Sequence, residues 1–281
     1  MIGAASFGHQ YGVANSSFVD VEKSKEILKI ASYAGVAKID TAPNYGNSEQ
    51  VLGSCGLEEF DLFTKVEVEA WDLGDEETIS ALRGSLFRLG KSSIAGLTFH
   101  SGGSVLRDPD RAKQFIECAK ESGLIEAWGV SVYTPEEALE ILDCCTPDYL
   151  QAPVSIADRR FLEPRIQDRL NNQRVDLQAR SLFLQGVLLS DADRVPSGFS
   201  SSASLLQRYR DLSVELGISK TQLALMPVLQ RPEVKMVVLG VNEPQHLRSI
   251  LEAIETGPEV DVQMIPYSSD IELLDPRRWG K

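Results

Sequence analysis

The chain has 281 residues, of which 43% are apolar and 25% are charged, and its net charge is −13 with a pI of about 4.8. This composition is typical of a globular protein with ample material for a core. The acidic balance argues against nucleic acid and anionic membrane surfaces as general partners, because both attract basic surfaces. A local site for a small anion is still possible. No apolar run approaches the length that spans a bilayer.

The cysteines predict neither a metal site nor a disulfide framework. Cys55, Cys118, Cys144 and Cys145 contain no C-x-x-C pair, so buried structural thiols are the simplest interpretation. The chain also starts without the basic region and apolar core of a secretory signal. We therefore expect a cytoplasmic protein without a metal centre.

Strand and helix patterns alternate along the chain. Strand candidates cover residues 2–7, 36–41, 60–66, 94–99, 125–132, 149–154, 175–183 and 235–239. Helical patterns cover residues 21–33, 48–54, 75–90, 110–121, 134–145, 161–171, 204–216, 220–230 and 244–255. Thr134 followed by Pro135 is a good helix start, and Gly35 and Gly123 mark helix ends. Residues 256–281 form an acidic C-terminal tail that contains several prolines.

Regular alternation of this kind favours a parallel sheet with helices between its strands. Eight units in about 250 residues fit a closed (β/α)₈ TIM barrel, so we expect one domain over residues 1–281. The alternative is an open, doubly wound sheet. That fold favours a G-x-G-x-x-G turn after the first strand, and Gly3, Gly8 and Gly12 do not have this spacing.

Four polar residues follow three consecutive predicted strands. Asp40 ends the second strand, Tyr45 lies on the loop beyond it, Lys65 ends the third strand and His100 follows the fourth. Each has a structural explanation by itself, such as a helix cap or a strand-end lysine. In a barrel, however, the carboxyl ends of the strands form the face that carries the active site. The sequence therefore predicts that these four side chains share one site.

The four residue types suit proton transfer to an oxygen atom. The pKa of a free tyrosine is about 10, and a nearby buried lysine lowers it because the ammonium favours the phenolate. The aspartate keeps the lysine charged, and the histidine can donate a hydrogen bond to a carbonyl oxygen as charge develops there. No serine, cysteine or metal nucleophile is evident, so hydride from a cofactor is the natural partner of this chemistry.

The pattern Asp-Thr-Ala-x-x-Tyr-Gly-x-Ser-Glu at residues 40–49, with Lys65 and His100 on the next two strands, resembles the catalytic tetrad of the aldo-keto reductase family. The resemblance extends over nearly the whole chain. Residues 180–186, Arg-Ser-Leu-Phe-Leu-Gln-Gly, are similar to a bacterial branch of that family. The resemblance implies a hydride transfer between NADP(H) or NAD(H) and a small aldehyde or ketone. It also implies that Tyr45 is the general acid, that Lys65 and Asp40 support it, and that His100 orients the carbonyl.

The same resemblance implies a set of cofactor contacts without a separate nucleotide-binding domain. Residues 129–131 match the Gly-x-Ser segment of the family, and Gln151 matches the glutamine that holds the nicotinamide carboxamide. The full set of expected contacts is Ser131, Gln151, Arg180, Ser181, Leu182, Gln185, Gly240, Asn242 and His246.

Three positions differ from the family pattern. Val132 replaces the asparagine that usually follows the serine, and Arg180 replaces the aromatic residue that commonly stacks on the nicotinamide ring. A guanidinium plane can also stack, or can meet a pyrophosphate. Glu243, in the loop after the eighth strand, would repel the 2′-phosphate of NADPH, and Arg248 is the cation nearest to it in sequence. NAD(H), or use of both nucleotides, is therefore as plausible as NADP(H).

The substrate side is less determined. His9, Tyr11 and Trp71 are candidates for contacts with the substrate, and the bacterial branch suggests a sugar-like aldehyde or ketone. Two other functions stay open: a nucleotide-sensing barrel without catalysis, as in channel-associated members of the family, and a metal-dependent barrel hydrolase. The complete tetrad argues against the first. The second is disfavoured because the chain has three histidines and no His-x-His pair.

Overall fold

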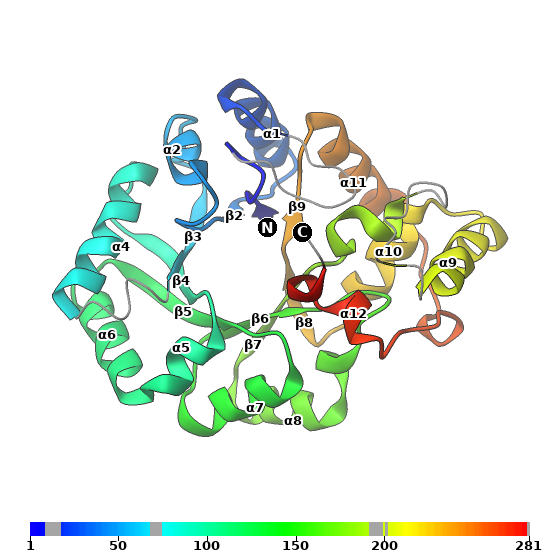
Figure 1. Cartoon of the computed structure of the whole chain (residues 1–281). Coiled ribbons are helices and arrows are strands. Elements are labelled where there is room, and N and C mark those ends of the chain that lie inside the picture. The colour runs from blue at the N-terminus through cyan, green and yellow to red at the C-terminus, as the bar shows by residue number, and fades with distance from the viewer. Residues whose placement is uncertain (9–17, 68–74, 191–198, 200–201, 280–281) are drawn as a thin grey trace.

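The architecture is a barrel of parallel strands surrounded by helices (Figure 1). It was obtained as a computed structural model, which describes residues 1–8, 18–67, 75–190, 199 and 202–279. The strands are β1 (Ile2–Gly3), β2 (Lys38–Asp40), β3 (Asp61–Val66), β4 (Ile94–Phe99), β5 (Ile125–Ser131), β6 (Tyr149–Pro153), β7 (Asp176–Arg180), β8 (Val234–Val237) and β9 (Leu239–Gly240). Every neighbouring pair is parallel. The (β/α)₈ prediction is confirmed, and the open sheet is excluded.

The eighth strand closes the barrel in two steps. Its first half, β8, pairs with β7, whereas its second half, β9, pairs with β1. Val238 separates the halves, and its backbone N–H donates to the carbonyl of Ala179 at 2.8 Å. One chain segment therefore joins both ends of the strand order.

Helices cover the outside of the barrel and shield the apolar outer faces of the strands (Figure 1). They are α1 (Val21–Tyr33), α2 (Ser48–Gly53), α4 (Asp75–Leu89), α5 (Gly102–Arg107), α6 (Pro109–Glu121), α7 (Pro135–Cys144), α8 (Pro164–Gln173), α9 (Ala203–Glu215), α10 (Lys220–Leu229), α11 (Pro244–Thr256) and α12 (Ile271–Leu274). Thr134 caps α7 with its side chain, as its position before Pro135 predicts. None of the described helices is both long enough and apolar enough to cross a bilayer.

Two aromatic rings depend on glycines in the neighbouring strands. The rings of Phe63 and Tyr149 meet edge to face with their centroids 5.8 Å apart. A Cβ atom on Gly129 would lie 2.1 Å from the Tyr149 ring, and one on Gly96 would lie 2.3 Å from Phe63. Burial raises the pKa of Tyr149 far above its usual range, and its hydroxyl is 2.9 Å from the hydroxyl of Thr98. The glycines thus make room for a packed, neutral phenol.

The structure corrects several predicted boundaries. The first strand does not extend to Phe7, because the chain turns after Gly3 and the Phe7 N–H donates to the carbonyl of Ala4. The seventh strand ends at Arg180 instead of residue 183, because Ser181 has a positive φ of 64°. Helix α5 was not predicted, and a six-residue helix gives little periodic signal.

The C-terminal segment is part of the packed structure. Leu273 and Leu274 of α12 are buried in a second apolar cluster, together with Leu206 of α9 and Leu223 of α10. Beyond α12, Arg277 lies over the ring of Tyr133, which follows β5. The chain therefore returns across the open end of the barrel (Figure 1).

Candidate active site

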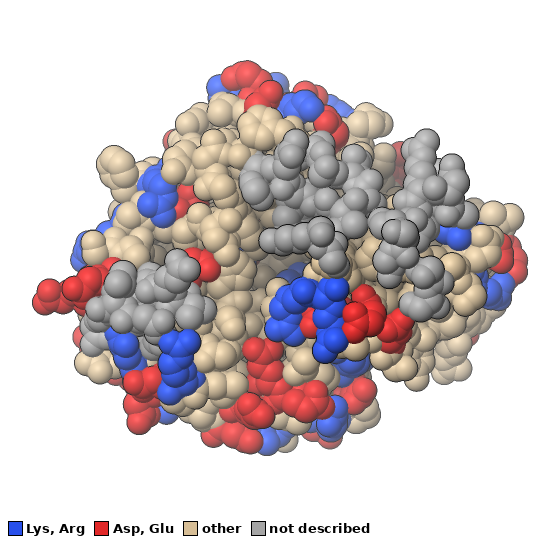
Figure 2. All heavy atoms as spheres, in the orientation of Figure 1, with Lys and Arg blue, Asp and Glu red and all other residues tan. Residues whose placement is uncertain are grey.

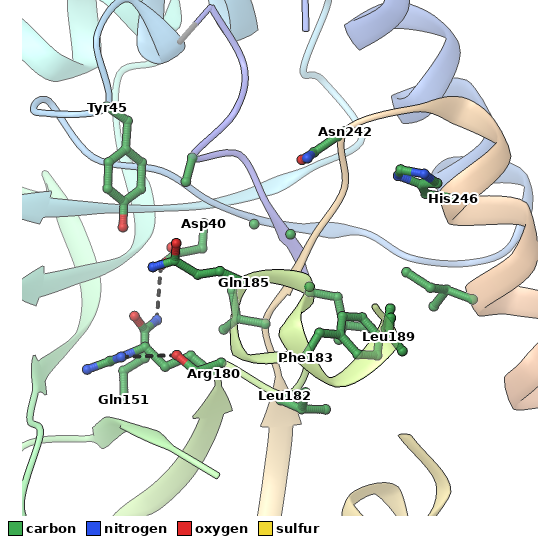
Figure 3. A pocket seen from close by; sticks show the side chains of 18 of the residues that line it. Asp40, Tyr45, Gln151, Arg180, Leu182, Phe183, Gln185, Leu189, Asn242 and His246 are labelled. Atoms are coloured by element: carbon green, nitrogen blue, oxygen red, sulfur yellow. Dashed lines mark hydrogen bonds between the residues drawn. The ribbon is translucent and has the colours of Figure 1, made fainter. Parts of the chain in front are cut away.

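A cavity of about 620 Å³ opens among the residues that follow the strands. Asp40, Tyr45, Lys65 and His100 all line it, as the sequence predicts. The expected cofactor contacts line it too, namely Ser131, Gln151, Arg180, Ser181, Leu182, Gln185, Gly240, Asn242 and His246. Figure 3 places Tyr45 on one side and Asn242 and His246 on the other, with Gln151 and Arg180 at the base. The roles of these residues remain predictions.

A buried ion pair forms the centre of the site. The Nζ of Lys65 is 2.6 Å from each carboxylate oxygen of Asp40 and 3.2 Å from the carbonyl oxygen of Thr41. The side chains of Lys65 and Asp40 are only 2% and 5% exposed. Asp40 also accepts a hydrogen bond from Nε2 of Gln151 at 3.0 Å. Both charges are thus compensated, which a buried charge requires.

Tyr45 lies within reach of this pair. The ammonium of Lys65 is 5.5 Å from the centre of the phenol ring, and the phenol points into the cavity (Figure 3). The rings of Tyr45 and His100 meet edge to face at 5.9 Å. A positive charge at this distance favours the phenolate over the phenol. The ammonium and the phenol thus lie as the predicted proton transfer requires.

His100 has a partner that the sequence analysis did not identify. Its Nδ1 atom is 2.6 Å from Oε1 of Glu67, which follows β3. The side-chain amide of Asn44 is 3.2 Å from the same Nδ1 atom. The strand register pairs Val66 with Phe99, so Glu67 and His100 are the next residues on adjacent strands. That register is the signal from which this contact could be predicted.

Comparison with known proteins decides the family. The model of the Aldo/keto reductase family matches residues 1–267. The chain belongs to the aldo/keto reductase family. It is therefore an oxidoreductase that uses NAD(P)H and acts on small carbonyl compounds.

Three individual similarities accompany this match. A putative voltage-gated potassium channel subunit beta of Schizosaccharomyces pombe is 25% identical and aligns over 98% of this chain and 91% of its own length. The uncharacterized oxidoreductase YqkF of Bacillus subtilis is 24% identical, with 82% of each chain covered. The holo form of aldo-keto reductase AKR11C1 from Bacillus halodurans superposes with a TM-score of 0.77 at 22% identity, covering 96% of this chain and 94% of that one. The last comparison supports the fold alone.

Arg180 of this aldo/keto reductase is held by two neighbours at the cavity wall. Its guanidinium carbon is 4.2 Å from the centre of the Tyr133 ring, and one guanidinium nitrogen donates to the carbonyl of Val132 at 3.1 Å. The carbonyl that binds Arg180 thus belongs to the residue that replaces the usual asparagine. The Nε atom of Arg180 is buried without a hydrogen-bond partner, so the guanidinium retains a donor that is not used.

The loop after Arg180 adopts a left-handed backbone that side chains rarely favour. Ser181, Leu184 and Gln185 have φ values of 64°, 46° and 52°. Conformations of this kind cost free energy and cluster at functional sites. Here they turn Ser181 and Gln185 toward the cavity. The sequence motif at residues 180–186 therefore corresponds to a strained wall of the site.

The segment at the start of α11 presents mostly paired charges. Glu243 makes a 2.7 Å ion pair with Lys23 of α1, a partner that the sequence analysis missed. Arg248 lies 3.9 Å from Glu26. Asn242 and His246 face the cavity on either side of Glu243 in the sequence. A helix N-terminus at this place favours a phosphate group.

The weak candidates for substrate contacts, His9, Tyr11 and Trp71, lie outside the residues that the structure describes. The described cavity lining adds Tyr133, Phe183, Leu189 and Thr221 to the set that the sequence suggested. Phe183 belongs to the motif at residues 180–186, whereas Tyr133, Leu189 and Thr221 belong to no motif and are identified by their position alone. Within the described parts of the chain, no group of three or more His, Cys, Asp or Glu side chains is placed to hold a metal ion.

Proposed function

We propose that Tyr45 donates the proton when this enzyme reduces the carbonyl group of a small aldehyde or ketone. The observation that carries the proposal is the buried Lys65–Asp40 pair, 2.6 Å apart, beside the phenol. When bound, the dihydronicotinamide supplies a hydride to the carbonyl carbon. Tyr45 supplies a proton to the oxygen, and Lys65 stabilises the phenolate that is left. The hydride and the proton together convert the carbonyl group into an alcohol. The Tyr45 phenolate then takes up a proton from solvent.

The described residues fit a nicotinamide cofactor. The Nε2 atom of Gln151 already donates to Asp40, so its Oε1 atom is the group that can accept from the carboxamide. The Ser131 hydroxyl, which also lines the cavity, can donate to the carboxamide oxygen. The positive charge of Arg180, which lines the cavity, and the N-terminus of α11 favour the negative charge of the nucleotide. We assign the cofactor contacts on these grounds.

Two measurements test the proposed activity. Titration of NADPH and NADH by fluorescence gives the preferred nucleotide. A turnover screen with that nucleotide then covers aldehydes, ketones and keto sugars, since a sugar-like substrate is part of the proposal. Oxidation of the nucleotide by at least one group of carbonyl compounds is expected. Tight binding of the nucleotide without its oxidation by any compound of the panel would contradict the proposed activity.

The alternative is a nucleotide-binding protein without turnover, which the channel-subunit names of some relatives suggest. The buried pair of Lys65 and Asp40 argues against it, because binding alone does not require a compensated ammonium next to a phenol. The same screen separates the two, because only the alternative predicts bound nucleotide that stays reduced.

We also propose that the chain works in a reducing compartment such as the cytoplasm. All four cysteines are free thiols in the structure. The expectation of buried thiols holds only for Cys145, because Cys55 and Cys144 are half-buried and Cys118 is exposed. Burial, with the neighbouring Cys144 thiol, raises the pKa of Cys145 to about 12, so this thiol is unreactive at neutral pH.

The charge at Glu243 leads to a prediction about nucleotide choice. Substituting Glu243→Gln removes a negative charge near the α11 N-terminus and frees the ammonium of Lys23. Both changes favour the 2′-phosphate of NADPH. We expect the ratio of NADPH to NADH affinity to rise about fivefold to tenfold, which corresponds to roughly 1 kcal/mol for a partly exposed charge. Fluorescence titration of both nucleotides measures this ratio.

A matched control is Glu255→Gln, which makes the same change near the other end of α11. This variant should leave the ratio unaltered. An equal rise in both variants would point to the overall charge of the protein. An unchanged ratio in Glu243→Gln would remove Glu243 from the account of nucleotide choice.

A further inference from the structure

The imidazole of His100 has one nitrogen bonded to a carboxylate that stands outside the cavity. Nδ1 of His100 and Oε1 of Glu67 are 2.6 Å apart, and the two side chains are 20% and 26% exposed. His100 lines the active-site cavity, whereas Glu67 lines a separate cavity of about 530 Å³, to which Glu77 of α4 also contributes. Glu67 therefore contacts the histidine without contributing to the described lining of the active-site cavity.

The chemistry of the two partners decides where one proton lies. An ionised carboxylate has only lone pairs, so it can accept a hydrogen bond but cannot donate one. At 2.6 Å, two facing lone pairs would repel, so Nδ1 carries a hydrogen and donates it to Glu67. The structure places the amide nitrogen of Asn44 3.2 Å from the same Nδ1 atom. Two donors cannot share a hydrogen bond, so with the hydrogen on Nδ1 this amide must turn its oxygen toward the ring.

This assignment limits what the other nitrogen can do. A neutral imidazole carries one hydrogen, so the ring with its hydrogen on Nδ1 has a bare lone pair on Nε2. Such a ring cannot donate to a carbonyl oxygen. It becomes a donor at Nε2 only when it takes up a second proton. The Glu67 carboxylate stabilises that proton by charge attraction at short range.

We propose that Glu67 is a positioning residue that fixes Nδ1 of His100 as a donor, so that His100 polarises the substrate carbonyl as a doubly protonated imidazolium. The inference rests on the proposed role of this site in carbonyl reduction. Among the described residues, the Glu67 carboxylate after β3 and the Tyr45 phenol after β2 face the imidazole. The Lys65–Asp40 pair lies next to Tyr45, with the Lys65 ammonium 5.5 Å from the centre of the phenol ring. An ionic donor strengthens polarisation, because a charge-assisted hydrogen bond is stronger than a neutral one.

Nitrogen NMR tests the proton positions without any turnover. The chain has only three histidines, so long-range proton–nitrogen spectra of protein labelled at histidine are simple, and a His100→Gln variant assigns the signals. We expect the spectra to show a proton on Nδ1 of His100, because Glu67 accepts from that nitrogen at 2.6 Å. A neutral ring with its proton on Nε2 would overturn the proposal.

The substitution Glu67→Gln removes the charge and keeps the shape. In this variant a share of the His100 rings should carry the proton on Nε2 instead of Nδ1, whereas Glu67→Asp, which keeps the charge, should restore the proton on Nδ1. At neutral pH, kcat in Glu67→Gln should fall about tenfold, the difference between a charged and a neutral hydrogen bond. This loss should shrink as the pH is lowered, with KM for the nucleotide unchanged. Spectra of Glu67→Gln in which Nδ1 keeps its proton as fully as in the wild type would contradict the proposal.

The matched control is Glu77→Gln, which alters a second carboxylate of the same outer cavity. It should leave the proton positions on the His100 ring as they are in the wild type. If the chain proves unable to reduce any carbonyl, the NMR result still tests the Glu67–His100 assignment. Conversely, if the enzyme is active but its neutral His100 carries the proton on Nε2, the proposed function stands and the proposed role of Glu67 is wrong.

Discussion

Substituting Tyr45→Phe is expected to lower kcat about a thousandfold, within the range attributed to one proton-transfer group. The change removes the phenol oxygen and keeps the ring that meets His100 edge to face. Lys65 then has a charge beside a ring that cannot ionise. Nucleotide affinity should stay within about twofold, because Tyr45 lies across the cavity from Asn242 and His246 (Figure 3). Steady-state kinetics and nucleotide titration measure the two effects separately.

The control for this variant is Tyr133→Phe, the same chemical change in another residue of the cavity. Tyr133 contacts Arg180 and Arg277 through its ring, which phenylalanine keeps. It should retain turnover within about threefold, because no proton transfer is assigned to it. Full turnover by Tyr45→Phe would remove Tyr45 from the mechanism. Equal losses in both variants would mean that the cavity has changed its shape.

Substituting Lys65→Met is expected to lower the free energy of unfolding by about 3–5 kcal/mol, as well as to abolish turnover. The reason is the partner that remains. Asp40 would be left at 5% exposure without its cation and, within the part of the chain that the structure describes, would retain the hydrogen bond from Gln151. Such an uncompensated carboxylate costs more than the ion pair contributes. Urea unfolding followed by circular dichroism measures the loss.

A second substitution separates stability from catalysis. In the double variant Lys65→Met with Asp40→Asn, both charges are gone, and the asparagine can still accept from Gln151 through its amide oxygen. We expect most of the lost stability to return, while turnover stays as low as in the single variant. If the double variant is as unstable as Lys65→Met alone, the cause is packing and not the unpaired charge.

The fold could be predicted because its signals are local and repeated. The cap at Thr134 and the strand of apolar residues at 94–99 each depend on a few neighbouring side chains. The break at Val238 could not be predicted in this way, because it depends on β7 and β1 pairing with different halves of one segment. The burial of Leu273 was also hidden, since its partners on α9 and α10 are distant in the sequence.

The residues of the candidate site also fall into those that the local sequence identifies and those that depend on distant partners. The sequence predicts Asp40, Lys65 and His100 as site residues because each lies at the end of a predicted strand or directly after it. Glu67 was not, because a single acidic residue two positions after a lysine gives no sign of the histidine with which it pairs. That contact depends on strand register, which alternation does not specify. Tyr133 and Lys23 were likewise hidden, because their partners come from other elements.

Charge on the face of the barrel shows why composition is a poor guide to a site. Acidic and basic side chains both surround this face, and basic ones gather near its middle, where the C-terminal segment crosses in Figure 1 (Figure 2). Arg277 belongs to that segment and pairs with Asp275. A net charge of −13 therefore coexists with cations around the cavity.

The contact between Gly129 and Tyr149 has an evolutionary consequence. Gly129 opens the Gly-x-Ser segment, yet a Cβ atom there would collide with the Tyr149 ring at 2.1 Å. Its lack of a side chain is thus explained by an aromatic neighbour and not by a nucleotide. Relatives that carry a larger residue at this position should carry a smaller one in place of Tyr149. The two positions are expected to vary together, while the serine of the segment varies independently of both.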